Sequence, residues 1–400
     1  MGQQEPKSIN VGPRSGIRAS IGLVAILGLL VIPSVVVTDS ASANGACSGE
    51  VQPAGSGSMI DPYLVATAPN LIWISKKRAV NSLQKIYLQT AEIDLGGCTF
   101  SPIGDNSEPF GFFNAATYDG GGFVIRGLKI VGSGGSTGLF GQSLGVIRNV
   151  GIENALVSGD SQVGALVGYN RGNVFNSYSS GQVSGSTDHI GGLIGHNDAI
   201  VGNSYSTASV SGSMYVGGLI GLHCTQSADV TNSYASGTVT STNTAQAGGL
   251  FPSSDACANP GLEVDASFWD TQTTGQSGFT IAGKAEGRSS AQMKTLATYT
   301  TAPASWDIVQ GWVPYSPDPT GGNPARIWGI CSEFNSGYPF LLWQASSDPC
   351  VSAAAPATTT TTTPTLATTG ANVEWLLVGG LIAVIAGSGF LAVSRRKRTA

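Results

Sequence analysis

A short glycine-rich motif returns at almost constant spacing through the middle of the chain. TGLFG at 137–141 recurs as GALVG at 164–168, as GGLIG at 191–195 and 217–221, and as GGLF at 248–251. The leucines of these copies lie 27, 27, 26 and 31 residues apart and are Leu139, Leu166, Leu193, Leu219 and Leu250. An internal period of this length is typical of repeat proteins, in which each repeat is one structural unit.

Two further elements keep the same period. One is an asparagine, followed by SYS or SYA in the last three copies; its members are Asn149, Asn176, Asn203 and Asn232. The other is a valine in a Ser/Gly-rich setting; its members are Val157, Val183, Val210 and Val239. Each period therefore holds three short β-prone pieces separated by Gly, Asn, Ser and Asp, with hardly any helical periodicity. Glycine supplies 56 of 400 residues, but without the Gly-X-Y period of collagen.

This pattern predicts an all-β fold, a right-handed parallel β-helix (β-solenoid) with capping segments at both ends. A single coil cannot bury its apolar residues, whereas stacking brings equivalent positions to about 4.8 Å from each other. We therefore expect the leucines to form an internal ladder and the asparagines to hydrogen-bond along the stack at a bend. Glycine beside each leucine suits tight corners and positive φ angles.

The repeats resemble a known family. VGALVGYNRGNVFNSYSSGQVSG at 163–185 and IGGLIGHNDAIVGNSYSTASVSG at 190–212 are similar to the GLUG motif repeats of bacterial surface proteins. Flanking pieces such as YLQTAEIDLGG and SFWDTQTTGQSG extend the resemblance over roughly 55–343. The motif is specific for the family but not for one biochemical activity.

The last copy departs from the repeat. The period lengthens where LHCTQSADV is inserted, and Pro252 replaces the final glycine. We expect a loop there, held by Cys224 and Cys257. The open strand edges at the two ends of a solenoid would pair with other chains unless they are covered. The segments outside the repeats, which contain Trp, Tyr and Pro, can cover them. The expected organisation is a signal peptide (1–43), an N-terminal cap (44–119), the repeats (120–270), a C-terminal cap (271–350), a Thr-rich linker (351–365) and a sorting signal (366–400).

The N-terminal residues have the layout of a secretory signal peptide. Three basic residues precede an apolar run at 21–37, and Ala41 and Ala43 follow in an A-x-A arrangement. We expect cleavage after Ala43. The alternative is an uncleaved membrane anchor, which the glycines and proline inside the run disfavour.

The C-terminal residues predict a membrane-spanning helix. The segment 375–393 carries no charge over nineteen residues, which as a helix spans about 28 Å, close to the thickness of a bilayer core. Three arginines and a lysine follow it at 395–398, so the C-terminus is expected in the cytoplasm and the preceding chain outside. The alternative is a buried globular helix.

A pentapeptide precedes this span, after the Thr-rich stretch. It consists of Leu366, Ala367, Thr368, Thr369 and Gly370. Pentapeptide, span and basic tail in this order resemble the LPXTG-type sorting signal of Gram-positive bacteria. The resemblance implies that a sortase cleaves between Thr369 and Gly370 and joins Thr369 to peptidoglycan. Ala367 stands where the usual motif has proline, as in the LAXTG variant of high-GC actinobacteria.

Charge and cysteine content fit an exported protein. Residues 44–369 hold 12 basic and 21 acidic side chains, a balance that disfavours nucleic acid as a partner. All six cysteines lie in this part, where disulfides are the default in an oxidising compartment. Six cysteines allow fifteen pairings. Proximity along the chain favours Cys224 with Cys257 and Cys331 with Cys350, which leaves Cys47 with Cys98.

The sequence gives only weak indications of catalytic, phosphate-binding or metal-binding motifs. The repeated GGLIG lacks the lysine and the helix of a phosphate-binding loop. His189, His196 and His223 have no metal-ligand spacing, so we expect neither metal nor cofactor, and we expect His196 in a solvated turn. Asp160 and Asp188 come near to stacking on adjacent coils, but aligned on the apolar residues that follow them they are one position out of register.

The sequence therefore predicts an extracellular, wall-anchored or single-pass membrane protein that acts in binding or adhesion and has no catalytic activity of its own. The expected partners are a sortase, peptidoglycan, the membrane, and a host, neighbour-cell or glycan ligand. The alternatives are a β-helix enzyme that cleaves polysaccharides and a structural component of the cell wall.

Overall fold

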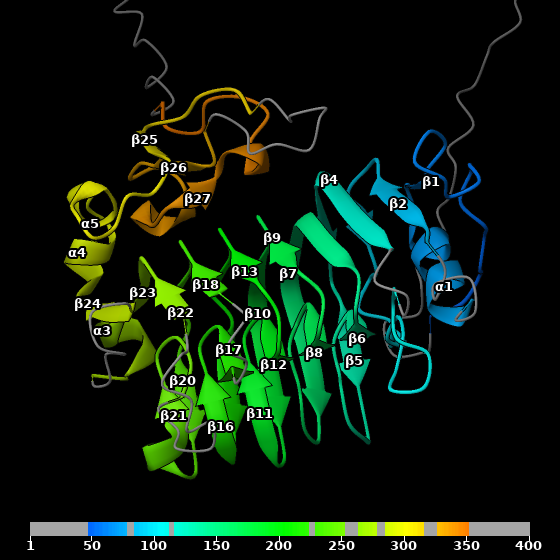
Figure 1. Ribbon diagram of the computed structural model, residues 1–400, viewed down its shortest axis with the longest axis horizontal. Helices are drawn as coiled ribbons and strands as arrows, with labels where there is room; N and C mark the ends of the chain where they lie inside the picture. Colours follow the sequence, from blue (N-terminus) through cyan, green and yellow to red (C-terminus); the bar gives the residue numbers. More distant parts are fainter. Residues whose placement is uncertain are drawn as a thin grey trace, which may run out of the picture. The chain divides into compact units, whose positions relative to one another are not determined.

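The computed structural model describes residues 47–77, 84–111, 116–223, 229–252, 263–277, 285–315 and 326–351. The chain divides into two compact units, Met1–Cys350 and Val351–Ala400, and all described residues except Val351 belong to the first. In this unit, short strands stack coil upon coil in an all-β solenoid of about six turns, with few helices (Figure 1).

Each repeat strand pairs in parallel with its equivalent one coil further on. The sheet that follows the leucines consists of β6 (Phe140–Ser143), β8 (Val167–Asn170), β12 (Ile194–Asn197) and β17 (Ile220–His223). The sheet that precedes them consists of β11 (Asp188–Gly191), β16 (Met214–Gly217) and β21 (Ala247–Gly248). Because the period is one coil, the register matches the repeat: Val183 pairs with Val210.

The third sheet is much larger, with seventeen strands, and it includes strands from both flanks of the repeat. They are β1 (Tyr63–Val65), β2 (Ile86–Gln89), β3 (Ile93–Asp94), β4 (Thr117–Arg126), β5 (Lys129–Val131), β7 (Val146–Gly159), β9 (Val174–Phe175), β10 (Tyr178–Gly185), β13 (Val201–Gly202), β14 (Tyr205–Ser206), β15 (Ser209–Gly212), β18 (Asp229–Thr231), β19 (Tyr234–Ala235), β20 (Val239–Ser241), β22 (Glu263–Asp265), β23 (Ser267–Asp270) and β24 (Ala285–Arg288).

The leucines of the repeat lie inside the coils. Leu139, Leu166, Leu193 and Leu219 are fully buried, and Leu250 is almost so. Their backbones continue the stack, since the N–H of Leu193 donates to the carbonyl of Leu219 at 2.9 Å. Burying a leucine side chain is worth about 1.5–3 kcal/mol, so this column is a main source of stability for the coils.

The asparagines lie at a sharp bend of the large sheet, Asn149 within β7 and the other three between two strands. All four have left-handed φ angles: 54° at Asn149, 50° at Asn176 and Asn203, and 47° at Asn232. Asparagine adopts this conformation more readily than most residues. Side-chain amides also bond along the stack, from Asn176 to Asn149 at 3.2 Å and from Asn232 to Asn203 at 3.4 Å. Ala266 takes the same bend in the next coil, with φ 46°.

The N-terminal segment contributes both strands and a helix. Strands β1, β2 and β3 pair in parallel with one another or with β4, so part of the segment expected as a cap extends the coils themselves. The helix α1 (Ala68–Lys76) is preceded by its N-cap residue, Thr67, whose hydroxyl accepts a hydrogen bond from the N–H of Asn70 in a capping box. It lies beside β1 in Figure 1 and packs its buried face, including Leu71 and Ile74, into the solenoid core.

The C-terminal segment lies partly at the end of the stack, where β24 pairs with β23, and partly along the side of the coils. It contains α3 (Thr271–Thr274), α4 (Ser290–Met293), α5 (Ala297–Thr300), β25 (Ile308–Gln310), β26 (Trp328–Ile330), β27 (Phe340–Leu341) and short 3₁₀ turns. Much of it forms a second core against the outward side of the large sheet. We call residues 293–315 and 326–344 the lateral cover. The lateral cover buries a column of outward-facing tyrosines of the large sheet, which removes their apolar surface from water.

Two of the three favoured disulfide pairings are present, Cys47–Cys98 and Cys331–Cys350. Cys224 and Cys257 lie outside the described residues, as do the signal-peptide residues Ala41 and Ala43, the pentapeptide at 366–370 and the apolar segment at 375–393. Among the helices of the described residues, none is long and apolar enough to cross a membrane.

Candidate functional site

A column of tyrosines runs along the outside of the large sheet. Tyr178, Tyr205 and Tyr234 occupy the same position in successive coils, with ring centroids 4.9 and 4.8 Å apart and interplanar angles of 5° and 3°. The lateral cover buries all three. Burial is the main cause that raises the pKa of each phenol, so these hydroxyls remain protonated and act as hydrogen-bonding groups.

Three tryptophans of the lateral cover each reach one bend of the solenoid. The indole N–H of Trp343 donates to the carbonyl of Asn176 at 3.1 Å, and that of Trp328 to Oδ1 of Asn203 at 3.3 Å. Trp306 donates to the carbonyl of Ala266, which occupies the equivalent bend, at 2.6 Å. Oxygen atoms at these bends thus accept the three indole hydrogen bonds, which position the lateral cover against the coils.

A groove opens where the lateral cover meets β2 and β4. It has a volume of about 550 Å³, within the roughly 300–1,000 Å³ typical of small-molecule sites. We call it the lateral groove. Its lining consists of Leu88, Gln89, Thr90, Asp119, Gly121, Gly122, Phe123, Asn149, Trp312, Pro314, Tyr315, Trp343, Ala345 and Ser346.

Asp119 supplies the charge on the polar wall of the lateral groove. Its carboxylate accepts from Nε of Arg148 at 2.9 Å, from Nδ2 of Asn149 at 3.0 Å and from the N–H of Gly121 at 2.9 Å. Burial, and then the charge of Asp119, raise the pKa of Tyr315, while Arg148 lowers it. The carboxylate is therefore held in one orientation, with lone pairs available to a ligand.

Aromatic side chains are the main contribution of the lateral cover to the lining. Trp312 and Tyr315 are only partly buried, and the indole N–H of Trp312 donates to the carbonyl of Leu342 at 3.3 Å, which orients its ring. Gly121 and Gly122 have φ of +60° and +80°, and a Cβ on Gly122 would lie 3.3 Å from Cβ of Trp343. Glycine here lets the cover approach β4 closely.

The histidines lie on another face of the coils. His196 is part of strand β12 rather than a solvated turn; its ring stacks on Tyr169 with centroids 4.6 Å apart, and its Nε2 lies 3.3 Å from Oδ1 of Asp198. The Tyr169 hydroxyl donates to Asp198 at 2.5 Å, and burial together with this bond raises the pKa of Tyr169 to about 12. His189 lies 5.3 Å from His196, centroid to centroid. His223 is buried, with Nδ1 3.1 Å from Nδ2 of Asn197.

These groups do not assemble a metal centre. Over the described ranges, no three His, Cys, Asp or Glu side chains are grouped so that they could hold a metal ion. Val163 pairs with Ile190, a register that leaves Asp160 and Asp188 one position apart along the stack. Asp160 accepts instead from the hydroxyl of Ser186 at 2.9 Å. The structure thus brings His189 and His196 together with tyrosines, and it keeps Asp160 and Asp188 out of register.

Comparisons with known proteins agree with the repeat architecture. Residues 212–240 match the GLUG motif. The chain is 34% identical over 149 residues to halomucin of Haloquadratum walsbyi, and 39% identical over 97 residues to a protein of Evansella cellulosilytica named as a Gly-rich membrane protein. These matches cover 33% and 24% of this chain, but only 2% and 10% of the two relatives.

A solved structure shares the fold. A crystal structure from Bacteroides ovatus, named as that of an immunoglobulin A1 protease, superposes with a TM-score of 0.53 over 73% of this chain and 95% of that chain. The sequences are 19% identical, so the likeness concerns the fold. One of the two relatives is named as a membrane protein, and this chain is a β-solenoid that contains a match to the GLUG motif.

Sequence reasoning missed the lateral groove. Asp119 and Trp312 are separated by the whole repeat region, and no spacing relates them. The available signal was the concentration of Trp, Tyr and Pro after the repeats, which we interpreted as a cap. That signal indicates a surface for burial or stacking, but it does not indicate which coil the surface meets.

Proposed function

We propose that the protein is a cell-surface carbohydrate-binding protein and that the lateral groove is its binding site. The observation that carries the proposal is the pairing of partly exposed aromatic rings, Trp312 and Tyr315, with the fixed carboxylate of Asp119 in one groove.

The aromatic and the polar lining match the two kinds of surface on a sugar ring. A pyranose has an apolar C–H face, which packs on an aromatic ring, and a rim of hydroxyls, each a donor and an acceptor. Asp119 accepts from such hydroxyls, while Thr90 and Ser346, both exposed, can donate and accept at the edge of the groove. The groove is larger than one ring needs, so a short oligosaccharide is the expected ligand.

Surface display is the second part of the proposal. The expected signal peptide at 1–43 exports the chain, and the pentapeptide ending at Thr369 and Gly370 lets a sortase attach it to peptidoglycan. The name of one relative, a Gly-rich membrane protein, supports a location at the membrane. Recovery of Thr369 in amide linkage to peptidoglycan, by mass spectrometry of wall digests, tests this part. Recovery of the protein in the membrane fraction with residues 370–400 still attached contradicts this part of the proposal.

The competing function is carbohydrate cleavage. Most glycoside hydrolases use two carboxylates that flank the scissile bond, and Asp119 is the one carboxylate among the described residues that line the groove. The fold-level neighbour named as a protease makes a catalytic role worth testing as well. The binding experiment therefore includes an assay for released sugar and for peptide cleavage.

The test is a glycan array followed by calorimetry on the full-length protein. Trp312→Ala and Asp119→Asn are expected to weaken binding of the best glycan at least about tenfold, as central aromatic and charged contacts do. Tyr169→Ala is the matched control, because that ring lies on β8 outside the groove, and its affinity should be unchanged. Melting temperatures check folding. The proposal is contradicted if the protein binds no glycan on the array, or if Trp312→Ala binds the best glycan as tightly as the unaltered protein does. It is also contradicted if the protein cleaves the glycan.

A further inference from the structure

We propose that a second pocket, at the last coil of the solenoid, binds the vicinal hydroxyls of a single neutral sugar ring. This goes beyond the proposed function, because the pocket shares no lining residue with the lateral groove. Its volume is about 260 Å³, just below the roughly 300–1,000 Å³ typical of sites for larger ligands. The size therefore suits one ring rather than a chain.

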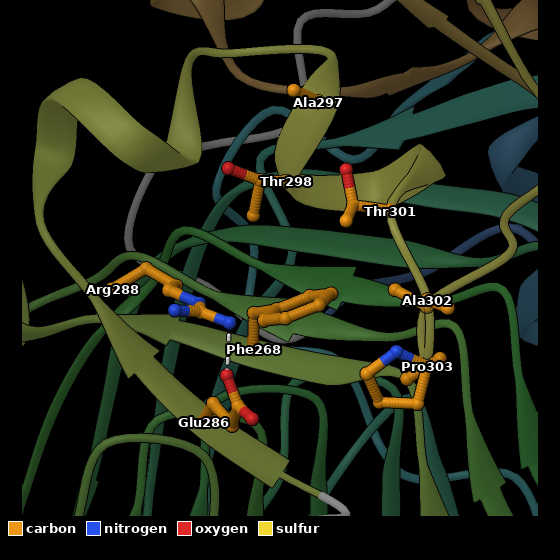
Figure 2. A pocket seen from close by; sticks show the side chains of 10 residues that line it. Phe268, Glu286, Arg288, Ala297, Thr298, Thr301, Ala302 and Pro303 are labelled. Atoms are coloured by element: carbon orange, nitrogen blue, oxygen red, sulfur yellow. Dashed lines mark ion pairs between the residues drawn. The ribbon is translucent and has the colours of Figure 1, made fainter.

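The pocket lies between strand β24 and the helix α5 with the residues that follow it. Figure 2 shows Glu286 and Arg288 on one side and Thr298, Thr301 and Ala297 across from them. Pro303 with its neighbouring alanines completes the wall. The lining thus combines small apolar side chains with two threonine hydroxyls and one pair of charged side chains.

Glu286 and Arg288 form an ion pair inside this lining. They are two positions apart on β24, so both side chains leave the same face of the strand, and Nη2 of Arg288 contacts Oε2 of Glu286. The guanidinium lies over the ring of Phe268, 5.8 Å from its centroid. Nε of Arg288 is buried and has no hydrogen-bond partner among the described residues. The pair therefore presents donors and an acceptor side by side, in a fixed place.

The charge balance selects a neutral ligand. The pair is neutral as a whole, so an anion or a cation would leave an uncompensated charge in a partly desolvated pocket, which is unfavourable. A zwitterion would have to lose the hydration of two further charges. Two adjacent hydroxyls make the same contacts at lower cost, because each can donate to Glu286 and accept from Arg288. The C–H groups of the ring then contact Ala297 and Pro303.

The test reads both sites at once by NMR of alanine methyl groups in the full-length protein. Methyl glycosides of glucose, mannose and galactose are the probes, and permethylated glucose is the control without hydroxyls. Binding in the pocket should shift the methyls of Ala297, Ala302 and Ala304 saturably, at millimolar concentration for so small a ligand. The methyl of Ala345 reports the lateral groove, so failure of one site is distinguishable from failure of the other.

Two variants make the result specific. Glu286→Gln should weaken the pocket response about tenfold, as expected for loss of a hydrogen bond to a charged group. Ala297→Phe should abolish it by filling the pocket, while Thr300→Phe on the same helix should not. No saturable shift with any glycoside overturns the proposal, as do equal shifts with permethylated glucose, a response that survives Ala297→Phe, or a stronger response to acetate or glycine.

Discussion

Two columns of stacked rings run along the outside of the same coils, but only one of them is covered. Tyr178, Tyr205 and Tyr234 stack at 4.8–4.9 Å on the large sheet and are buried by the lateral cover. Tyr169 and His196 stack at 4.6 Å on the β8–β12 sheet and stay partly exposed. Coil spacing explains the stacking in both columns, so the difference lies in the segment that packs on top.

The three tyrosines of the covered column are part of a second hydrophobic core, whereas Tyr169 and His196 of the open column are not. The Tyr234 hydroxyl donates to the carbonyl of Pro339 at 2.7 Å, and Trp328 lies 6.0 Å from Tyr205 and 4.8 Å from Trp306, centroid to centroid. On the open side, the rings meet water and titratable neighbours such as Asp198. We infer that the covered column contributes stability and that the open column responds to solvent conditions.

Removing the central indole of the cover should have the largest effect. Trp328→Ala deletes a fully buried side chain and is expected to lower the free energy of unfolding by about 3–5 kcal/mol. Tyr169→Ala on the open column should cost clearly less, because that ring already contacts water. Chemical denaturation of both variants measures the difference. Equal losses would show that the cover adds no stability beyond the stack.

A smaller effect is expected when only a hydroxyl is removed from the covered column. Tyr205→Phe loses the contact between the phenol oxygen and Nε2 of Gln344 at 2.8 Å, at a cost of about 1 kcal/mol. Tyr215→Phe, on β16 outside the cover, is the control and should change stability by a few tenths of a kcal/mol. If the two substitutions cost the same in urea denaturation, the hydrogen bond to the cover is unimportant.

The smallest expected effect is the contribution of His189 to the pH dependence of stability. Burial, and to a lesser extent His196, lower the pKa of His189 below 6.5, while Asp188 opposes them. The unfolded chain therefore takes up this proton at higher pH than the folded chain, so stability should fall as the pH drops through 6.5 toward the folded pKa.

His189→Gln should flatten this part of the pH profile, measured as denaturation midpoints between pH 5 and 7.5. Glutamine fits the site, because Gln162 takes the equivalent position one coil earlier with φ 50°, against 59° at His189. An unchanged slope in the variant would assign the pH dependence to other groups.

The repeat alone was enough to predict the interior. A period near 27 residues with leucine, asparagine and valine in phase indicates stacked coils, because each coil contacts mainly its neighbours and equivalent residues must meet. The buried leucines and the asparagines at left-handed bends follow from that one-dimensional rule. The disulfide Cys331–Cys350 also lies between cysteines close in sequence.

Only the tertiary structure decided what lies on the outside of the coils. The tyrosine that follows the last three asparagines recurs with the same period as the leucine, yet periodicity does not indicate that a non-repeating segment more than a hundred residues away along the chain from Tyr205 covers it. The same holds for the lateral groove, in which Trp312 faces β4, and for the pocket beside β24. Stacking is a local interaction repeated many times, whereas each contact of the cover is long-range and occurs once, so no pattern in the sequence records it.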